Sequence, residues 1–109
     1  MRAWRVHEYG RATSVMRLEE IDEPVPGLGE IRVRTTAVTL NFNDGDGIEG
    51  RYRTVAPTLP FTPGMEVVGV VDATGPGAER WAGRRVAAIP SMAYGGYAEA
   101  VLCSSKSAF

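Results

Sequence analysis

The run PFTPGMEVVGVV at residues 60–71 joins a turn rich in Pro and Gly to an apolar β-strand. Four valines fall within its last five positions, and β-branched side chains favour the extended backbone of a strand. Because these five positions leave no polar face, we expect the strand to be covered on both sides and to lie at the centre of the core.

Residues 31–40, on the amino-terminal side of this run, show a different pattern. Ile31 and Val33 alternate with Arg32 and Arg34, so the apolar side chains share one face and the charged ones the other. This alternation predicts a strand with one face in the core and one face in water. Further strands are expected at four ranges: 3–6, 16–21, 83–90 and 96–102.

Turn-forming residues separate these runs, because 13 Gly and 7 Pro are spread along 109 residues and do not form one low-complexity block. The only helical candidate is a short turn near residues 43–50. A chain of this length is expected to form one domain with its own core. Many short strands without a long amphipathic helix predict a mainly β fold, a small and partly open β-barrel with one or two short helices.

Charge and composition exclude several classes of partner. Twelve basic and thirteen acidic residues give a net charge of −1, and no basic patch is available for nucleic acid or for anionic lipid. No segment has the length of a signal-peptide core or of a membrane span, so we expect a cytoplasmic protein that does not bind membranes. Cys103 is the only cysteine, which excludes an internal disulfide, and we expect it to be an apolar packing residue.

Three segments combine polar and turn-forming residues: LNFND at 40–44, PFTPGME at 60–66 and GGYAE at 95–99. Their arrangement resembles the medium-chain dehydrogenase/reductase superfamily, and within it the zinc-independent quinone oxidoreductases. The first domain of that superfamily has a GroES-like, alcohol dehydrogenase-like fold. Its quinone-reducing members carry Asn-Phe-x-Asp, Pro-x-x-x-Gly-x-Glu and Gly-x-Tyr-Ala-Glu in the same order. The resemblance runs over the whole chain, residues 1–109.

The resemblance implies that residues 1–109 are the amino-terminal part of a GroES-like catalytic domain, with a Rossmann cofactor-binding domain outside this chain. It implies NADPH as the cofactor and, as the small-molecule substrate, a quinone or another conjugated carbonyl or enone compound. A homodimer is expected for the full-length protein. Two alternatives stay open: a stand-alone GroES-like binding or assembly module without catalytic activity, and a catalytically inactive relative.

Zinc-dependent relatives carry a Cys in the first of these segments and a His in the second, and both side chains are zinc ligands. Here Asn41 and Met65 stand at those positions. A carboxamide is a poor zinc ligand and a thioether a weak one, whereas zinc sites use thiolate, imidazole and carboxylate groups. The resemblance and this ligand chemistry together predict that no zinc is bound.

Asn41 is the candidate catalytic residue, because its carboxamide can hydrogen-bond the cofactor or a substrate carbonyl without a metal. The alternative is that Asn41 only forms an Asx turn at the end of a strand. Tyr52 and Glu66 are further candidates for cofactor binding; their structural alternatives are an exposed loop tyrosine and an exposed strand entry. Asp44 is expected to cap the short helix. Asp46 stands where many relatives have a second tyrosine, a difference that bears on substrate preference.

Overall fold

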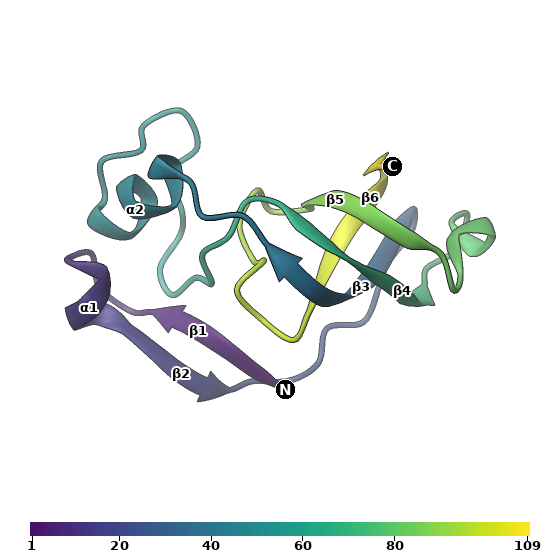
Figure 1. Ribbon diagram of the computed structural model, residues 1–109, viewed down its shortest axis with the longest axis horizontal. Coiled ribbons are helices and arrows are strands. Elements are labelled where there is room, and N and C mark those ends of the chain that lie inside the picture. Colours follow the sequence, from purple (N-terminus) through teal and green to yellow (C-terminus); the bar gives the residue numbers. More distant parts are fainter.

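The computed structural model describes residues 1–109 and contains two β-sheets (Figure 1). The smaller sheet is an antiparallel pair of β1 (Arg2–Val6) and β2 (Met16–Glu20), with α1 (Ala12–Val15) between them in the chain. The larger sheet is a closed barrel in the order β3-β4-β5-β6. Its strands are β3 (Glu30–Val38), β4 (Val67–Thr74), β5 (Arg85–Pro90) and β6 (Ala100–Ala108).

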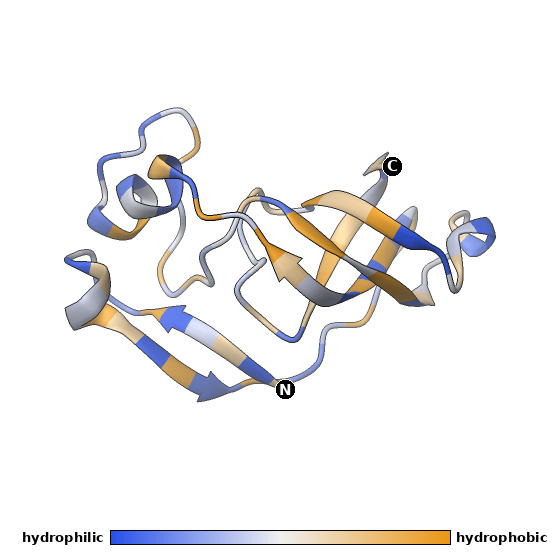
Figure 2. Ribbon diagram, viewed as in Figure 1, coloured by the Kyte–Doolittle hydropathy of each residue, from blue (hydrophilic) through white to orange (hydrophobic).

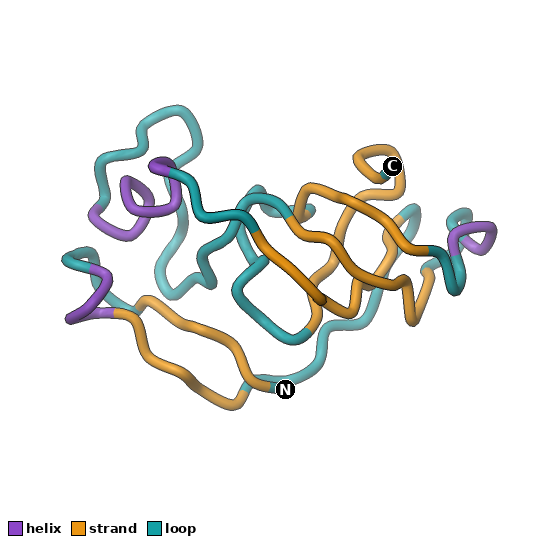
Figure 3. The backbone as a smooth tube through the Cα atoms, in the orientation of Figure 1, coloured by secondary structure: helices purple, strands orange, loops and turns teal.

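Helices are few and short (Figure 3). Helix α2 (Phe42–Glu49) follows β3, and the 3-10 turn η1 (Glu79–Trp81) lies between β4 and β5. None of the helices has the length and apolar character that crossing a bilayer requires. The mainly β barrel with short helices is therefore confirmed. All of its strand pairs are antiparallel, and the ring closes where β5 and β6 pair at two positions.

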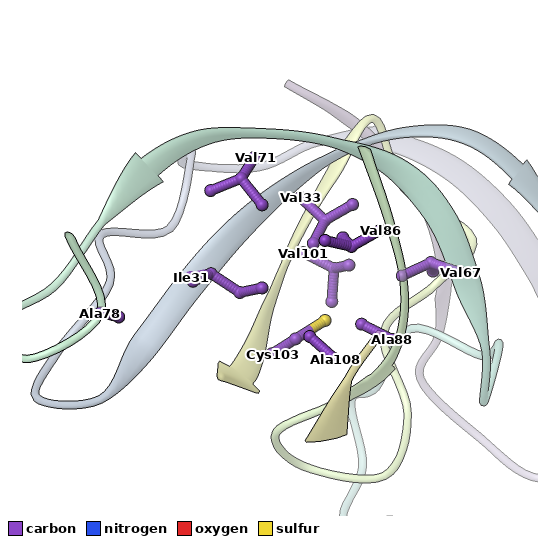
Figure 4. Close-up of a cluster of buried hydrophobic side chains, with 10 residues drawn as sticks. All are labelled: Ile31, Val33, Val67, Val71, Ala78, Val86, Ala88, Val101, Cys103 and Ala108. Atoms are coloured by element: carbon purple, nitrogen blue, oxygen red, sulfur yellow. The ribbon is translucent and has the colours of Figure 1, made fainter. Parts of the chain in front are cut away.

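The barrel interior holds the larger of two apolar clusters (Figure 4). Ile31 and Val33 of β3 are fully buried in it, whereas Arg32 and Arg34 hydrogen-bond Asp72 on the outer face. The alternation in residues 31–34 therefore marks a strand with one face in the core and one face in water, as predicted. The other members of the cluster come from the other three strands of the barrel and the turn after β4: Val67, Val71, Ala78, Val86, Ala88, Val101, Cys103 and Ala108.

Strand β4 is not covered on both sides, contrary to the expectation from its valines. Val67 and Val71 point into the barrel and are 2% and 1% exposed, whereas Val68 is 39% exposed. A single closed sheet has one interior, so side chains alternate between core and surface along each strand. The valines at outer positions therefore reflect the preference of β-branched residues for extended backbone.

Strand β6 begins at Ala100, four residues after the start of the expected range 96–102, and continues to Ala108. The segment before it bends around Gly64, whose carbonyl accepts hydrogen bonds of 3.0 Å from the backbone N–H groups of Gly95 and Gly96. Ala98 then pairs with Ala3 of the smaller sheet. Residues 95–99 therefore connect the barrel to that sheet and do not lengthen β6.

A second apolar cluster holds α2 in place. Its buried members come from β1, α1, α2 and two loops: Val6, Val15, Ile48, Phe61 and Tyr94. The rings of Phe61 and Tyr94 meet edge to face, with their centroids 5.4 Å apart. Gly47 lets α2 approach this pair, since a Cβ there would lie 3.1 Å from the Cε1 of Tyr94. The helix is thus anchored, and its first turn stays at the end of β3.

Candidate functional site

The three polar segments that the sequence analysis singles out converge where β3 passes into α2 (Figure 1). Asn41 and Asp44 belong to the first segment, Glu66 to the second and Tyr97 to the third. Hydrogen bonds join Asn41 to Glu66, Asn41 to Asp44, and Asp44 to Tyr97. The last of these bonds spans 53 residues of sequence, so one connected group of side chains unites segments that are distant in the chain.

Asn41 is the N-cap residue of α2, with extended backbone at φ −112° and ψ 156°. Its backbone N–H donates to the Oδ2 of Asp44 at 2.9 Å, so Asp44 caps the helix from its first turn, as expected. The side-chain Nδ2 of Asn41 donates to the Oγ1 of Thr39 at 3.1 Å and to the Oε1 of Glu66 at 3.3 Å. These two hydrogen bonds orient the amide of Asn41. The residue is exposed, so the oriented amide remains accessible to a ligand.

Asp44 is almost completely buried, with 3% of its surface exposed. Its Oδ2 also accepts a hydrogen bond of 3.0 Å from the phenol of Tyr97. Burial raises the pKa of Tyr97 above its ordinary value, and the charge of the Asp44 carboxylate raises this pKa further. The phenol therefore keeps its proton at neutral pH and acts as a donor to Asp44.

Asn41 and Glu66 lie at a hollow of about 400 Å³. Its other lining residues are Phe42, Asn43, Met65 and Ile89. The side chain of Phe42 is 96% exposed, so apolar surface stands directly beside the polar pair. A positioned amide next to an exposed aromatic ring is suited to contact a flat, unsaturated ligand that carries a polar atom.

A second hollow, of about 300 Å³, adjoins the first and shares Glu66 and Ile89 with it. Apolar side chains of the outer barrel surface line most of it, among them Val38, Val68 and Phe109. Figure 2 shows hydrophobic segments along β3, β4 and β5, the strands that border this hollow. The polar pair is therefore set in a largely apolar surface.

Tyr52 lies elsewhere. It packs against the second apolar cluster beside α2, and it is not among the residues that line either hollow. Asp46 is turned toward Arg51, to which it is paired at 3.0 Å. The structure thus brings Asn41 and Glu66 together and leaves Tyr52 apart, and a role for Tyr52 in cofactor binding stays a prediction.

No group of three or more His, Cys, Asp or Glu side chains in residues 1–109 is arranged to hold a metal ion. His7 pairs with Glu19 at 2.8 Å on the smaller sheet. Cys103 is fully buried in the barrel, where burial raises the pKa of its thiol to about 12. The groups that the site offers to a ligand are therefore two carboxamides, a carboxylate and apolar side chains.

Tyr97 is the residue of this group to which the sequence analysis assigned no role. Its segment was recognised, but nothing in the local sequence indicates that the phenol reaches Asp44. The ring lies against Gly64, where a Cβ would be 2.6 Å from the Tyr97 Cδ1. Gly64 makes room for the ring of Tyr97, which belongs to another segment. The sequence alone does not reveal this contact, because it depends on how the two segments pack in the fold.

Known proteins resemble this chain in sequence and in fold. The family described as the alcohol dehydrogenase GroES-like domain matches residues 27–109. An alcohol dehydrogenase of Moraxella sp. (strain TAE123) is 40% identical over 77 residues, which cover 71% of this chain and 22% of the relative. The quinone oxidoreductase of Homo sapiens is 32% identical over 110 residues, which cover 100% of this chain and 33% of the relative. The chain thus spans a third or less of the length of these relatives.

A solved structure extends the likeness to three dimensions. The quinone oxidoreductase of Escherichia coli, whose structure was determined in complex with NADPH, has a TM-score of 0.89 and 27% sequence identity with this chain. The superposition covers 100% of this chain and 32% of that one. The superposition therefore includes both sheets and α2 of this chain.

Proposed function

The chain belongs to the family of alcohol dehydrogenase GroES-like domains, among the quinone oxidoreductase-like medium-chain dehydrogenases/reductases, and we propose that it forms one wall of a reductase's active site. The reductase uses NADPH to reduce quinones or other conjugated carbonyl compounds. Residues 1–109 are, in this proposal, the amino-terminal part of the catalytic domain. A Rossmann domain of the longer protein provides most of the cofactor's binding surface, and two copies form a homodimer.

The Asn41 carboxamide is the observation that carries this proposal, because Thr39 and Glu66 hold it in one orientation at the hollow. A polar group that the protein has already oriented can bind a reacting carbonyl when one of its two hydrogen bonds is exchanged and the other keeps its orientation. Phe42 and Met65 beside it offer apolar surface to flat rings such as nicotinamide and quinone. NADPH supplies a hydride when it is bound. Asn41 then orients the acceptor that receives this hydride.

Asn41 has no unused amide hydrogen in this arrangement, because Nδ2 donates one to Thr39 and the other to Glu66. The bond to Glu66, at 3.3 Å, is the longer of the two and lies beyond the usual range for an N–H···O bond. In the proposed reaction the substrate carbonyl takes the place of the Glu66 carboxylate on Nδ2, while Thr39 keeps its bond. Glu66 therefore holds the amide in position until the substrate arrives.

The proposed reductase works without zinc. Asn41 and Met65 present a carboxamide and a thioether to the hollow, and zinc sites in proteins are built from thiolate, imidazole and carboxylate groups. Polarisation of the substrate oxygen is therefore assigned to hydrogen bonding from Asn41, a role that oxyanion-binding amides fill in other enzymes.

The proposal is tested by steady-state kinetics of the full-length protein with NADPH or NADH and a series of quinones and enones. Asn41→Ala removes the oriented amide, and the loss of one such group lowers kcat by about 10² to 10³. Asn43→Ala is the matched comparison, because it removes a second carboxamide from the same hollow, and we expect it to lose far less activity.

Two results would count against the proposal in different ways. Full activity of Asn41→Ala, together with a lower melting temperature, would show that the amide serves only the structure of the turn. A wild-type full-length protein that reduces none of the quinones and enones with either cofactor would remove the enzyme assignment altogether. A binding module would then be the better description.

A further inference from the structure

Tyr97 is connected to Asn41 through the buried side chain of Asp44. We propose that Tyr97 is a positioning residue, whose phenol holds the Asp44 carboxylate and thereby fixes the turn that presents the Asn41 amide to the hollow. The proposal rests on the proposed function, because it assigns to Tyr97 an effect on the reaction that it exerts without touching the substrate. Tyr97 lines neither the hollow at Asn41 nor the second hollow that shares Glu66 with it; it lines a third, of about 530 Å³, to which Asn41 does not contribute.

The Asp44 carboxylate can transmit an effect because few groups hold it. Only 3% of Asp44 is exposed, and its Oδ1 is buried without any hydrogen-bond partner. Its Oδ2 accepts from two donors, the Asn41 backbone N–H at 2.9 Å and the Tyr97 phenol at 3.0 Å. A buried carboxylate depends strongly on the donors that remain, so loss of the phenol changes its position relative to Asn41.

The phenol of Tyr97 is itself held by the fold. The Tyr97 backbone N–H donates to the Pro63 carbonyl at 2.9 Å, and the Tyr97 carbonyl accepts from the Trp4 N–H at 2.9 Å. The ring lies against Gly64, where a Cβ would be 2.6 Å from Cδ1. The position of Tyr97 is therefore restrained by the fold, and its phenol can in turn restrain the turn at the start of α2.

Both acceptors within reach of the phenol belong to the turn that carries Asn41. The first is the Oδ2 of Asp44 at 3.0 Å, and the second is the backbone carbonyl of Thr39 at 3.3 Å. The hydroxyl has one proton to donate, and the charged acceptor at the shorter distance receives it. The phenol thus lies within reach of Thr39 before Asn41 and of Asp44 after it. The side chain of Thr39 in turn accepts a hydrogen bond from the Asn41 amide.

Tyr97 is also linked to Glu66, the second residue that hydrogen-bonds the Asn41 amide. Gly64, which accommodates the Tyr97 ring, precedes Glu66 by two residues, and Glu66 accepts the other Nδ2 hydrogen bond of Asn41. Hydrogen bonds, ring packing and a short length of backbone thus close a loop from Asn41 through Asp44, Tyr97 and Gly64 to Glu66. The orientation of the amide is a property of this loop as a whole.

A double-mutant cycle in the full-length enzyme tests the proposal. Tyr97→Phe keeps the ring against Gly64 and removes only the hydroxyl, and we expect kcat with NADPH and a quinone to fall about tenfold, the scale of one hydrogen bond. The KM for NADPH should stay unchanged, because Tyr97 is not among the residues that line the hollow at Asn41. In an Asn41→Ala background the same substitution should have no further effect, since the residue through which it acts is gone.

Tyr94→Phe is the matched control. Its phenol donates to the Val55 carbonyl at 2.7 Å, away from the turn, so this variant should retain the wild-type kcat. Losses from Tyr97→Phe and Asn41→Ala that simply multiply in the double variant would overturn the proposal. An equal loss from Tyr94→Phe would overturn it as well, because the effect would then be one of general stability.

A readout that does not need turnover separates this proposal from the proposed function. The side-chain NH₂ resonances of Asn41, followed by NMR in the full-length protein, should shift in Tyr97→Phe and stay in place in Tyr94→Phe. If wild type reduces no acceptor, the proposed function fails while these resonances still decide the positioning role. Resonances unchanged by Tyr97→Phe would overturn it. Asp44→Asn, which replaces the charged acceptor at the same position, provides a second variant with the same expected shift.

Discussion

The phenol of Tyr97 donates a hydrogen bond of 3.0 Å to the Oδ2 of Asp44, across 53 residues of sequence. This bond ties the first turn of α2 to the segment that precedes β6. The same Asp44 oxygen accepts the backbone N–H of Asn41, so one buried carboxylate contacts both Tyr97 and the residue that carries the exposed amide. The stability of the fold and the geometry of the candidate site are therefore linked at one carboxylate.

Gly64 should tolerate no side chain. It has φ +101°, and a Cβ there would lie 2.6 Å from the Tyr97 Cδ1 and 2.7 Å from the Tyr97 backbone nitrogen. Gly64→Ala should lower the free energy of unfolding by about 2 to 5 kcal/mol, from backbone strain and overpacking together. Gly77→Ala is the control, because Gly77 has φ +86° with no atom within 4 Å of the added Cβ, and should cost only about 1 to 2 kcal/mol of strain. Equal losses in urea denaturation would show that the close approach to Tyr97 is unimportant.

Asp44→Ala should destabilise the protein by about 2 to 4 kcal/mol, because the Asn41 N–H loses its side-chain acceptor and the half-buried Tyr97 phenol keeps only the longer contact to the Thr39 carbonyl. Asp46→Ala, in the same helix, removes a carboxylate whose side chain is 37% exposed and pairs with Arg51. Surface ion pairs of this kind contribute at most about 1 kcal/mol. Thermal melts of the two variants would measure the difference, and a small effect of Asp44→Ala would contradict the role assigned to its hydrogen bonds.

Asp72 should make the fold sensitive to acid. Burial by itself would raise the pKa of Asp72, but hydrogen bonds from Arg32 and Arg34, and their charges, outweigh burial and hold this pKa below its ordinary value of 3.8. The unfolded chain therefore binds the proton first as the pH falls. The stabilisation that ionised Asp72 gives through Arg32 and Arg34 is fully present above pH 3.8. It is lost as the pH falls through the pKa of Asp72 in the folded protein.

Urea midpoints measured between about pH 5 and pH 2 should show this loss in wild type. Asp72→Asn removes the titrating group and should give a shallower pH dependence over the same range, with lower stability at neutral pH. An identical slope in the two proteins would mean that the pair with Arg32 and Arg34 contributes nothing measurable.

Cys103 should be unreactive in the folded protein. Its side chain is fully buried, and burial raises the pKa of its thiol to about 12, so neither access nor the reactive thiolate is available near neutral pH. A thiol reagent followed by mass spectrometry should leave the native protein unmodified and label it fully in denaturant. Rapid labelling under native conditions would show that the barrel opens readily around β6.

Local sequence pattern was sufficient for most of the barrel. Alternation identifies the buried face of β3, because successive side chains of any strand point to opposite sides. The same rule explains the error at Val68: four valines in β4 were interpreted as burial on both faces, but a closed single sheet has only one interior. The start of β6 was misplaced because residues 95–99 bond to the Gly64 turn and to Ala3, partners that no local pattern reveals.

For the candidate site, too, some features could be predicted from the sequence and others depended on the tertiary structure. The order of its polar segments in the sequence, with the family resemblance, was enough to select Asn41 and Glu66, and their chemistry follows from residue type alone. The tertiary structure decided that Asn41 and Glu66 meet, that Tyr52 lies apart from them, and that Tyr97 holds Asp44. Residue type determines which bonds a side chain can form, whereas the partner it meets is set by the packing of segments distant in the chain.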